Sequence, residues 1–207
     1  MQTQVSPPAE APRSTPAADK ILDVAEQLAQ TRGFNGFSYA DIAAKLNVTK
    51  ASLHYHFRSK ADLGRALIAR YHVVFERALA AIADGPGDAR AKLLRYVDLY
   101  YDVIVSDRMC LCGMLAAEYA TLPVPMQAEL RLFFDANERW LTVRLDEGRR
   151  AGKLAFREPA KERARLLVGA LEGAMLVARV YGDGGRFRAA GLAAIADLHV
   201  RRASNVA

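Results

Sequence analysis

Residues 49–58 carry several side chains that can bind nucleic acid, and their spacing matches one face of a helix. The members of this face follow the spacing i, i+1, i+4, i+5 and i+8: Lys50, Ala51, His54, Tyr55 and Arg58. Leu53 and Phe57 lie four residues apart on another face and should anchor the helix to a core. The major groove of DNA admits one α-helix, whose N-terminal residues contact base edges. The pattern predicts a helix that reads DNA with its outward face.

Different side chains of this segment suit different parts of a duplex. Lys50 can donate to guanine acceptors, and Thr49 or Ala51 can contact a thymine methyl group. Tyr55 and His56 suit backbone phosphates, and Lys60 could hold a phosphate together with the free N–H groups of the next helix. The full set of expected DNA contacts is Ser38, Thr49, Lys50, Ala51, Ser52, His54, Tyr55, His56 and Lys60.

Capping and stop residues predict the short helices that would position this face. A first helix begins at Thr15-Pro16 and ends at Gly33, a second runs from Ser38 to Asn47, and a third runs from Thr49 to Phe57. Ser38 and Asp41 form a capping-box pattern. The turn of three or four residues between the second and third helices is typical of a helix-turn-helix.

The remainder of the chain is also predicted to be helical. The expected helices span about 59–83, 88–106, 110–120, 127–152, 159–181 and 187–202. We therefore expect an all-α fold with an N-terminal three-helix helix-turn-helix domain and a C-terminal helical domain. The expected boundaries are a disordered tail at 1–14, a DNA-binding domain at 15–64, and a helical domain at 65–207, for which the family resemblance given below implies ligand (effector) binding and dimerisation.

The charge distribution fits a polyanionic partner. The net charge is +6 and the pI is about 9.5. Residues 1–70 carry nine Lys and Arg against six Asp and Glu, a net charge of +3, and the stretch from Lys45 to Lys60 contains no acidic residue. A solvated basic face would show the same charges.

Other function classes find little support in the sequence. His54 and His56 diverge on a helix and cannot chelate one ion, and no His and Cys residues have zinc-like spacing, so we expect no metal and no cofactor. The chain has no glycine-rich phosphate loop and no nucleophile elbow, so we do not expect an enzyme. No apolar run approaches the ~20 residues that span a bilayer, and the N-terminus does not resemble a secretory leader, so we expect a cytoplasmic protein without a membrane partner.

The helix-turn-helix segment resembles the TetR/AcrR family of transcriptional regulators. The resemblance covers about 20–68 and rests on these stretches: Gly33-Phe34, Ser38–Leu46, Val48–Phe57 and Ser59–Leu63. It implies a homodimer that binds a double-stranded DNA operator and is released by a small-molecule effector. Most such proteins repress, and some activate. The sequence departs from the family pattern at His54, where Tyr is commoner.

An effector site is expected in the second half of the chain, where aromatic, sulfur-containing and charged side chains lie on helices that could converge. The candidates are Tyr100, Cys110, Cys112, Met114, Glu118, Trp140, Met175 and Arg179. The polar members Glu118 and Arg179 would orient a ligand. The same aromatic and methionine pattern is also typical of an ordinary core.

Cys110 and Cys112 allow two interpretations. They are too few and too close for a disulfide framework, and both could be small buried hydrophobic residues. Alternatively, one could sense electrophiles or oxidants, because Arg108 and the start of a helix would lower the pKa of a thiol.

Small residues line one face of the penultimate predicted helix. They are Gly169, Ala170, Gly173, Ala174 and Ala178. Because small faces let helices approach closely, we expect this helix and the last one to form a four-helix dimer interface. Packing within one chain is the alternative.

Overall fold

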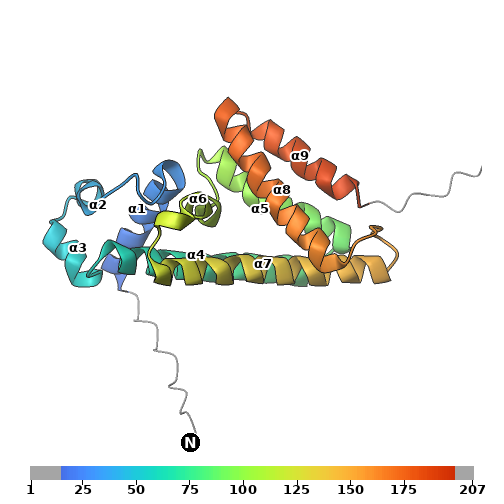
Figure 1. The fold of residues 1–207 in the computed structure, drawn as a ribbon, viewed down its shortest axis with the longest axis horizontal. Coiled ribbons are helices and arrows are strands. Elements are labelled where there is room, and N and C mark those ends of the chain that lie inside the picture. The colour runs from blue at the N-terminus through green and yellow to red at the C-terminus, as the bar shows by residue number, and fades with distance from the viewer. Residues whose placement is uncertain (1–14, 199–207) are drawn as a thin grey trace, which may run out of the picture.

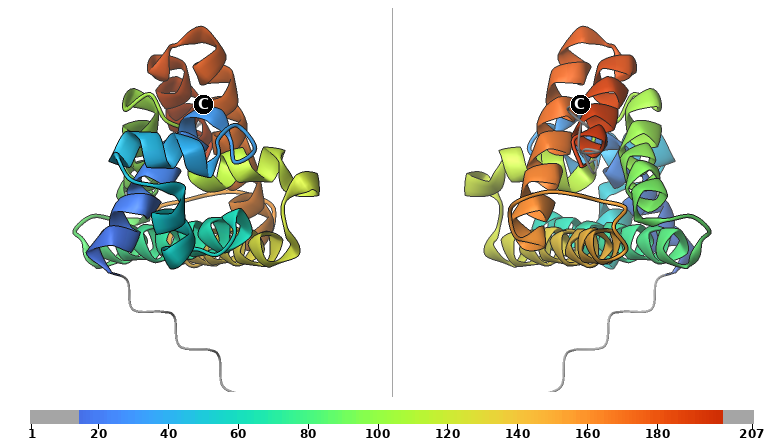
Figure 2. Two further views of the ribbon diagram at one scale, coloured as in Figure 1. Left: turned by 90° about the vertical axis from the view of Figure 1, so that its left-hand side faces the viewer. Right: turned by 90° about the vertical axis from the view of Figure 1, so that its right-hand side faces the viewer.

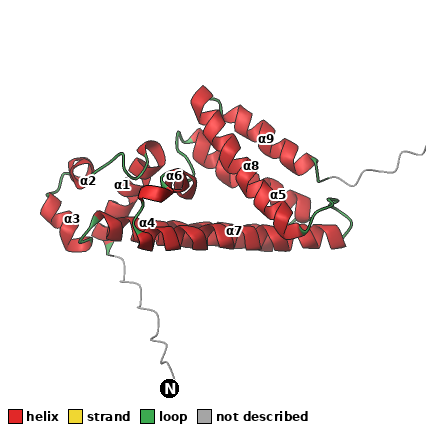
Figure 3. Cartoon of the chain, in the orientation of Figure 1, coloured by secondary structure: helices red, strands yellow, loops and turns green. Residues whose placement is uncertain are grey.

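The computed structural model describes residues 15–198, and this part of the chain is helical without strands (Figures 1 and 3). Its elements are α1 (Pro16–Arg32), α2 (Tyr39–Leu46), α3 (Lys50–His56), α4 (Lys60–Asp84), α5 (Ala89–Val105), α6 (Leu111–Ala117), the 3-10 turn η1 (Tyr119–Thr121), α7 (Val124–Arg150), α8 (Ala160–Tyr181) and α9 (Gly184–Ala196). The expected tail at 1–14 and the predicted end of the last helix at 199–202 lie outside the described residues.

Helices α1, α2 and α3 form a small group at one end of the molecule, which we call the head (Figure 1). Each begins at the predicted N-cap. The Thr15 hydroxyl accepts a hydrogen bond from the Ala18 N–H, and the Thr49 hydroxyl accepts one from the Ser52 N–H, both at 3.2 Å. Ser38 and Asp41 form the predicted capping box. These caps satisfy backbone donors that a helix start leaves without partners.

Helices α4 to α9 form the body. The two longest, α4 and α7, pack side by side, and α4 runs from the head into the body (Figures 1 and 2). Helices α8 and α9 pack on each other, with α8 against α7 and α9 against α5. The short helix α6 packs against α1, α4 and α7, so it lies where head and body meet.

Several boundaries differ from the predicted ones. Helix α7 begins at Val124 rather than near 127, because Pro125 occupies the first turn, where a missing N–H has no partner to lose. Helix α6 ends at Ala117 and continues as a 3-10 turn. Helix α9 begins at Gly184, because the side chain of Asp183 caps it by accepting from the Gly185 N–H.

Candidate DNA-binding interface

Helix α3 packs on the head through one side and exposes the other side to solvent. Leu53 is fully buried and anchors the helix to the head core. Ala51 and Tyr55 lie on the opposite side and are exposed, Tyr55 over 85% of its surface, and Lys50 and Ser52 are exposed beside them. The N-terminal turn of α3 therefore presents an ammonium, a hydroxyl and a small apolar side chain to solvent, together with an outward tyrosine. These groups can hydrogen-bond or contact base edges and phosphates.

Tyr39 fixes the C-terminal end of α3, a role that the sequence analysis missed. Its hydroxyl donates to the Phe57 carbonyl at 2.8 Å, and its ring lies 4.7 Å from the His54 ring, centroid to centroid. Burial, with a smaller contribution from the Asp62 charge, raises the pKa of Tyr39 to about 12. The phenol is therefore neutral and remains a donor at physiological pH. The aromatic residue directly after the N-cap of α2 was the available signal.

One ring nitrogen of His54 is occupied by a contact within the protein. Its Nδ1 lies 3.1 Å from the carbonyl oxygen of Arg58. A carbonyl can only accept, so Nδ1 must carry the hydrogen, and Nε2 is the ring nitrogen left to face a ligand. The His56 ring is half-buried and packs edge-on against Tyr55, with the centroids 5.2 Å apart. His56 therefore supports the exposed Tyr55 ring, whereas His54 is held by Tyr39 and the Arg58 carbonyl.

The ammonium of Lys60 is bound within the protein and is not free to contact a phosphate in this conformation. Its ammonium donates to the carbonyl oxygens of Phe34 and Phe37, both at 2.5 Å, and lies within 4.5 Å of both ring centroids. Burial lowers the pKa of Lys60, opposed by the charges of Glu118 and Asp41. The expected phosphate contact is corrected to an internal one: Lys60 braces the loop between α1 and α2. The sequence could not reveal this, because the acceptors are backbone carbonyls distant along the chain.

Ser38 likewise acts within the head. Its hydroxyl donates to Asp41 Oδ2 at 2.7 Å, and its N–H donates to the same oxygen at 2.8 Å. The hydrogen bonds from Ser38 lower the pKa of Asp41. The side chain is exposed, so its outer lone pairs remain open to solvent.

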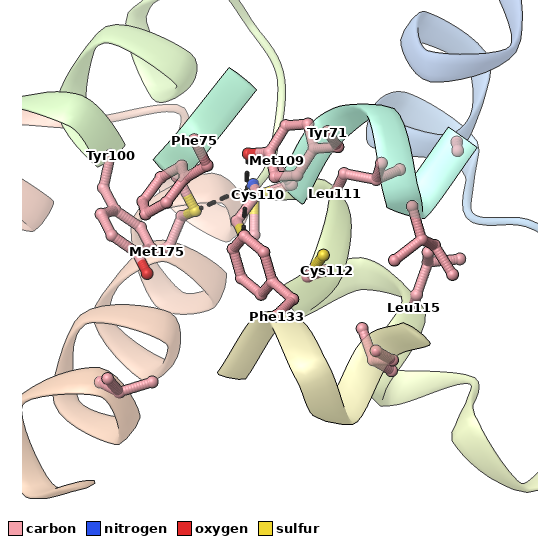
Figure 4. Packing of buried hydrophobic residues seen from close by; sticks show 14 of the residues in the cluster. Tyr71, Phe75, Tyr100, Met109, Cys110, Leu111, Cys112, Leu115, Phe133 and Met175 are labelled. Carbon is pink, nitrogen blue, oxygen red and sulfur yellow. Dashed lines mark hydrogen bonds between the residues drawn. The ribbon is translucent and has the colours of Figure 1, made fainter. Parts of the chain in front are cut away.

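Some of the expected effector residues meet in the centre of the body. Tyr100, Cys110 and Met175 lie together with rings from α4 and α7 (Figure 4). We call this group the central cluster; its members are Tyr71, Phe75, Tyr100, Cys110, Phe133 and Met175. The Cys110 N–H donates to Met175 Sδ at 3.2 Å, and the Tyr71 hydroxyl lies 3.9 Å from Cys110 Sγ. Four helices and the loop before α6 contribute to this cluster.

Both cysteines are buried in the core, in agreement with the first of the two interpretations of their role. Cys110 exposes 1% of its surface and Cys112 none. Burial raises the pKa of both thiols well above their ordinary value, and the Glu172 carboxylate raises them further. The expectation that Arg108 and a helix start lower a thiol pKa is therefore wrong for this conformation, because desolvation dominates.

Glu172 places a carboxyl beside the central cluster. Its Oε1 is buried without a hydrogen-bond partner, and its Oε2 lies so close to Gly113 that a Cβ there would be 2.0 Å away. Burial raises the pKa of Glu172 to about 7, and a hydrogen bond with Cys110 opposes the rise. A buried carboxyl oxygen without a partner is costly, so Oε1 of Glu172 is available to accept from a further donor.

Trp140 lies in an adjoining part of the core. Its ring stacks on Tyr96 at 5.5 Å, and its Nε1–H donates to the Leu79 carbonyl at 3.0 Å. The Tyr96 hydroxyl donates to Asn137 Oδ1 at 3.0 Å and lies 3.1 Å from that of Tyr100. A short chain of buried polar groups therefore connects this region with the central cluster.

Three expected effector residues lie elsewhere. Glu118 bonds to backbone N–H groups of the loop after α1, and Arg179 bonds to carbonyls of the last turn of α1. Met114 contacts Arg179 through its sulfur at 3.7 Å. The expectation that Glu118 and Arg179 orient a ligand is corrected, because their polar atoms are bound to the head. Within residues 15–198, no three His, Cys, Asp or Glu side chains are grouped to hold a metal, and no helix is long and apolar enough to cross a bilayer.

A three-helix head with a supported, outward-facing third helix, followed by a helical body, defines a helix-turn-helix DNA-binding protein. Comparisons with known proteins place it more narrowly. Residues 21–67 match the sequence profile described as bacterial regulatory proteins, tetR family. A TetR-family transcriptional regulator from Agrobacterium tumefaciens shares 32% identity over 89% of this chain and 98% of its own, with a TM-score of 0.86. The chain therefore belongs to the TetR family of transcriptional regulators.

Further relatives agree with this assignment. A TetR regulator from Legionella pneumophila is 31% identical, over 90% of this chain and 99% of its own, with a TM-score of 0.80. The HTH-type transcriptional repressor NemR of Escherichia coli K12 is 26% identical over 166 residues, which is 78% of this chain and 83% of that protein. The relatives are transcriptional regulators, and the helical fold is that of the family.

Proposed function

We propose that this protein is a homodimeric transcriptional repressor that inserts one α3 per protomer into the major groove of an operator and is released by a small-molecule effector bound in the body. In this proposal residues 15–64 bind DNA, and residues 65–207 bind the effector and the second protomer. The repressor named among the relatives supports repression over activation. A DNA-binding role also implies a cytoplasmic location.

The exposed N-terminal face of α3 carries the proposal. Lys50, Ala51, Ser52 and Tyr55 face solvent while Leu53 is fully buried, so the helix is exposed on the side that a groove would cover. We assign base contacts to Thr49, Lys50, Ala51 and Ser52. Tyr55, His56 and the Nε2 side of His54 then border the phosphates.

Replacement of Lys50 by Ala tests this placement. A lost bidentate contact to a base should cost about 1–3 kcal/mol and relax the preferred base at one position. The measurement is binding to a sequence selected by the wild type from a random DNA pool, compared with binding to base-substituted derivatives. Lys153→Ala, in the turn that follows α7, is the control. If Lys50→Ala keeps the full base preference, α3 does not read the groove as proposed.

Salt dependence tests DNA binding in general. With several phosphate contacts per dimer, affinity should fall on the order of a hundredfold or more between 50 and 200 mM salt. An affinity that is independent of salt would exclude a phosphate-contacting interface.

The proposed dimer interface is an apolar stripe on α8. Leu166, Val177 and Val180 expose 57%, 54% and 82% of their surface. Apart from the neighbouring backbone of α8 itself, a Cβ added at Gly169 or Gly173 would meet no described atom within 4 Å. These positions share one helical face, and exposed apolar surface of this kind favours a partner helix over solvent. A second α8 is the partner that closed symmetry supplies.

The proposed effector site is the central cluster with Glu172. Its side chains are packed, so a ligand must displace them and thereby shift the helices that contribute them. By linkage, a ligand that weakens DNA binding tenfold must itself bind tenfold more weakly to the DNA-bound protein. The buried, protonated thiols favour a non-covalent ligand.

Replacement of both cysteines by Ser separates the two modes of induction. Retained release of DNA by a compound would support a non-covalent site. Lost release with intact DNA binding would assign the response to the thiols instead. If neither the wild type nor the variant is released by any compound or oxidant, the effector part of the proposal fails.

A further inference from the structure

Two charged side chains of the body contact the end of α1 and the loop that follows it. Glu118, at the end of α6, accepts from the Phe34 N–H at 2.7 Å and from the Asn35 N–H at 3.3 Å. Arg179, in the last turn of α8, donates to the carbonyl of Gln30 at 3.3 Å and to that of Thr31. We call this pair, Glu118 and Arg179, the head–body clasp.

The charges of the clasp match the backbone groups that they bind. The last carbonyls of a helix carry partial negative charge and favour a guanidinium, whereas free N–H groups favour a carboxylate. Gly33 has a φ of 81°, and a Cβ there would lie 2.6 Å from Glu118 Oε1. The carboxylate therefore lies directly against the backbone at a position where only glycine leaves room.

Further bonds hold the same few residues. The Met109 N–H, in the loop before α6, donates to the Gln30 carbonyl at 3.2 Å, and the Gln30 side chain is buried. The Asn35 side chain donates to the Thr121 hydroxyl at 2.8 Å. Lys60, the first residue of α4, donates to the carbonyls of Phe34 and Phe37 in this loop. The loop is thus bonded on one side to α4 and on the other to α6 and η1.

The covalent connection between head and body is α4. A connection through one helix alone would let the head twist about the axis of α4 and bend where α4 enters the body. A second attachment, away from that axis, removes this freedom. Arg70 of α4 pairs with Asp23 and Glu26 of α1 and so attaches the head close to that axis. The clasp attaches the head farther along the body, through two other helices, α6 and α8.

We propose that Glu118 and Arg179 are positioning residues for DNA binding: they fix the orientation of α3 relative to the body and so set the spacing of the two recognition helices in the dimer. The proposal rests on the proposed function, because it takes α3 as the DNA-reading helix. It also assigns a route for release. Helix α6 begins beside Cys110 of the central cluster and ends at Glu118, so a shift of α6 moves the clasp.

The test measures how strictly the protein requires one operator spacing. The full-length wild type selects its preferred sequence from a random DNA pool, and derivatives carry one or two base pairs inserted at the centre. Glu118→Ala and Arg179→Ala should bind the selected sequence about tenfold more weakly. They should lose less further affinity on insertion than the wild type does, because an unclasped head can adjust. Glu118→Gln keeps one acceptor and should give intermediate values.

Matched controls come from the far end of the body. Arg149 donates to the Glu158 carbonyl at 3.2 Å, and Glu158 pairs with Arg163, so both make bonds like those of the clasp without touching the head. Arg149→Ala and Glu158→Ala should keep the wild-type dependence on spacing. Thermal unfolding of each variant confirms that it is folded, and Glu118→Gln replaces Glu118→Ala if the latter is not.

The outcomes separate the two proposals. If the wild type selects no sequence, the proposed function fails and the clasp proposal fails with it. If the wild type selects a sequence but the clasp variants keep its full spacing penalty, only the clasp proposal is overturned. The same is true if the far-end controls relax the spacing requirement as much as the clasp variants do. A relaxed requirement confined to the clasp variants supports it.

Discussion

The buried carboxyl of Glu172 should make stability depend on pH in a direction opposite to that of an ion-paired acid. Burial raises its pKa to about 7 in the folded protein, from an ordinary value of 4.5 in the unfolded chain. Between these values the folded state binds more protons than the unfolded state. The contribution of Glu172 therefore lowers the free energy of unfolding as pH rises from about 4.5 to about 7, and stays constant above that.

The size of this effect follows from the two pKa values. They differ by about 2.5, which corresponds to an upper limit of about 3 kcal/mol. Glu172→Gln has the same shape and does not titrate. The variant should be more stable than the wild type by up to about 3 kcal/mol at pH 8, or about 6–12 °C in Tm. Near pH 4.5 the difference should largely disappear, because the folded wild-type carboxyl is then protonated and that of the unfolded chain is already half protonated.

Urea unfolding at one fixed protomer concentration, from pH 4.5 to 8.5, measures this difference. Glu162→Gln is the control, because Glu162 is an exposed glutamate on the same helix. Its unfolding free energy should follow the wild type across this range. A Glu172→Gln difference that is the same at every pH would refute the reasoning, since it would show that the carboxyl titrates alike in both states.

Three other substitutions test the head and the dimer. Lys60→Met should destabilise the protein by about 1–3 kcal/mol, because two carbonyls lose a charged donor. The salt dependence of DNA binding should stay unchanged, and a smaller salt slope would show that Lys60 contacts a phosphate after all. Tyr39→Phe should cost about 0.5–1.5 kcal/mol in thermal unfolding and weaken DNA binding, because the end of α3 loses its hydrogen bond to Phe57; unchanged stability and affinity would contradict this role. Gly173→Leu should produce monomers in size-exclusion chromatography at micromolar concentration, because the small face becomes overpacked; an intact dimer would exclude this face.

Local signals in the sequence predicted the helices and the exposed face of α3. N-caps such as Thr15, Ser38 and Thr49 act within three residues of themselves, so their chemistry is legible without the fold. The burial of Leu53 opposite Ala51 and Tyr55 follows from helical periodicity alone. The start of α7 was misplaced because a proline can either end a segment or occupy the first turn of a helix, and Pro125 does the latter.

The roles of charged residues could not be predicted in the same way. Lys60, Glu118 and Arg179 are bound mainly by backbone groups 23 to 149 residues away in the chain. Backbone donors and acceptors carry no signature in the sequence. The position of Lys60 at a helix start therefore suggested a phosphate, and the aromatic residues around Glu118 and Arg179 suggested a ligand. The thiol pKa was misjudged for a related reason. Nearby charge can be read from the sequence, whereas the desolvation that dominates at Cys110 depends on packing.

The two buried cysteines allow opening of the body to be measured by thiol labelling. They are the only cysteines in the chain, and neither exposes more than 1% of its surface in the closed body. A maleimide can reach them only after α6 and its neighbours separate, so the labelling rate is the intrinsic rate of an exposed thiol multiplied by the fraction of open molecules. Mass spectrometry of the unmodified wild type could then rank compounds by how far they open the body. No dye or engineered residue would be required, and DNA need not be present.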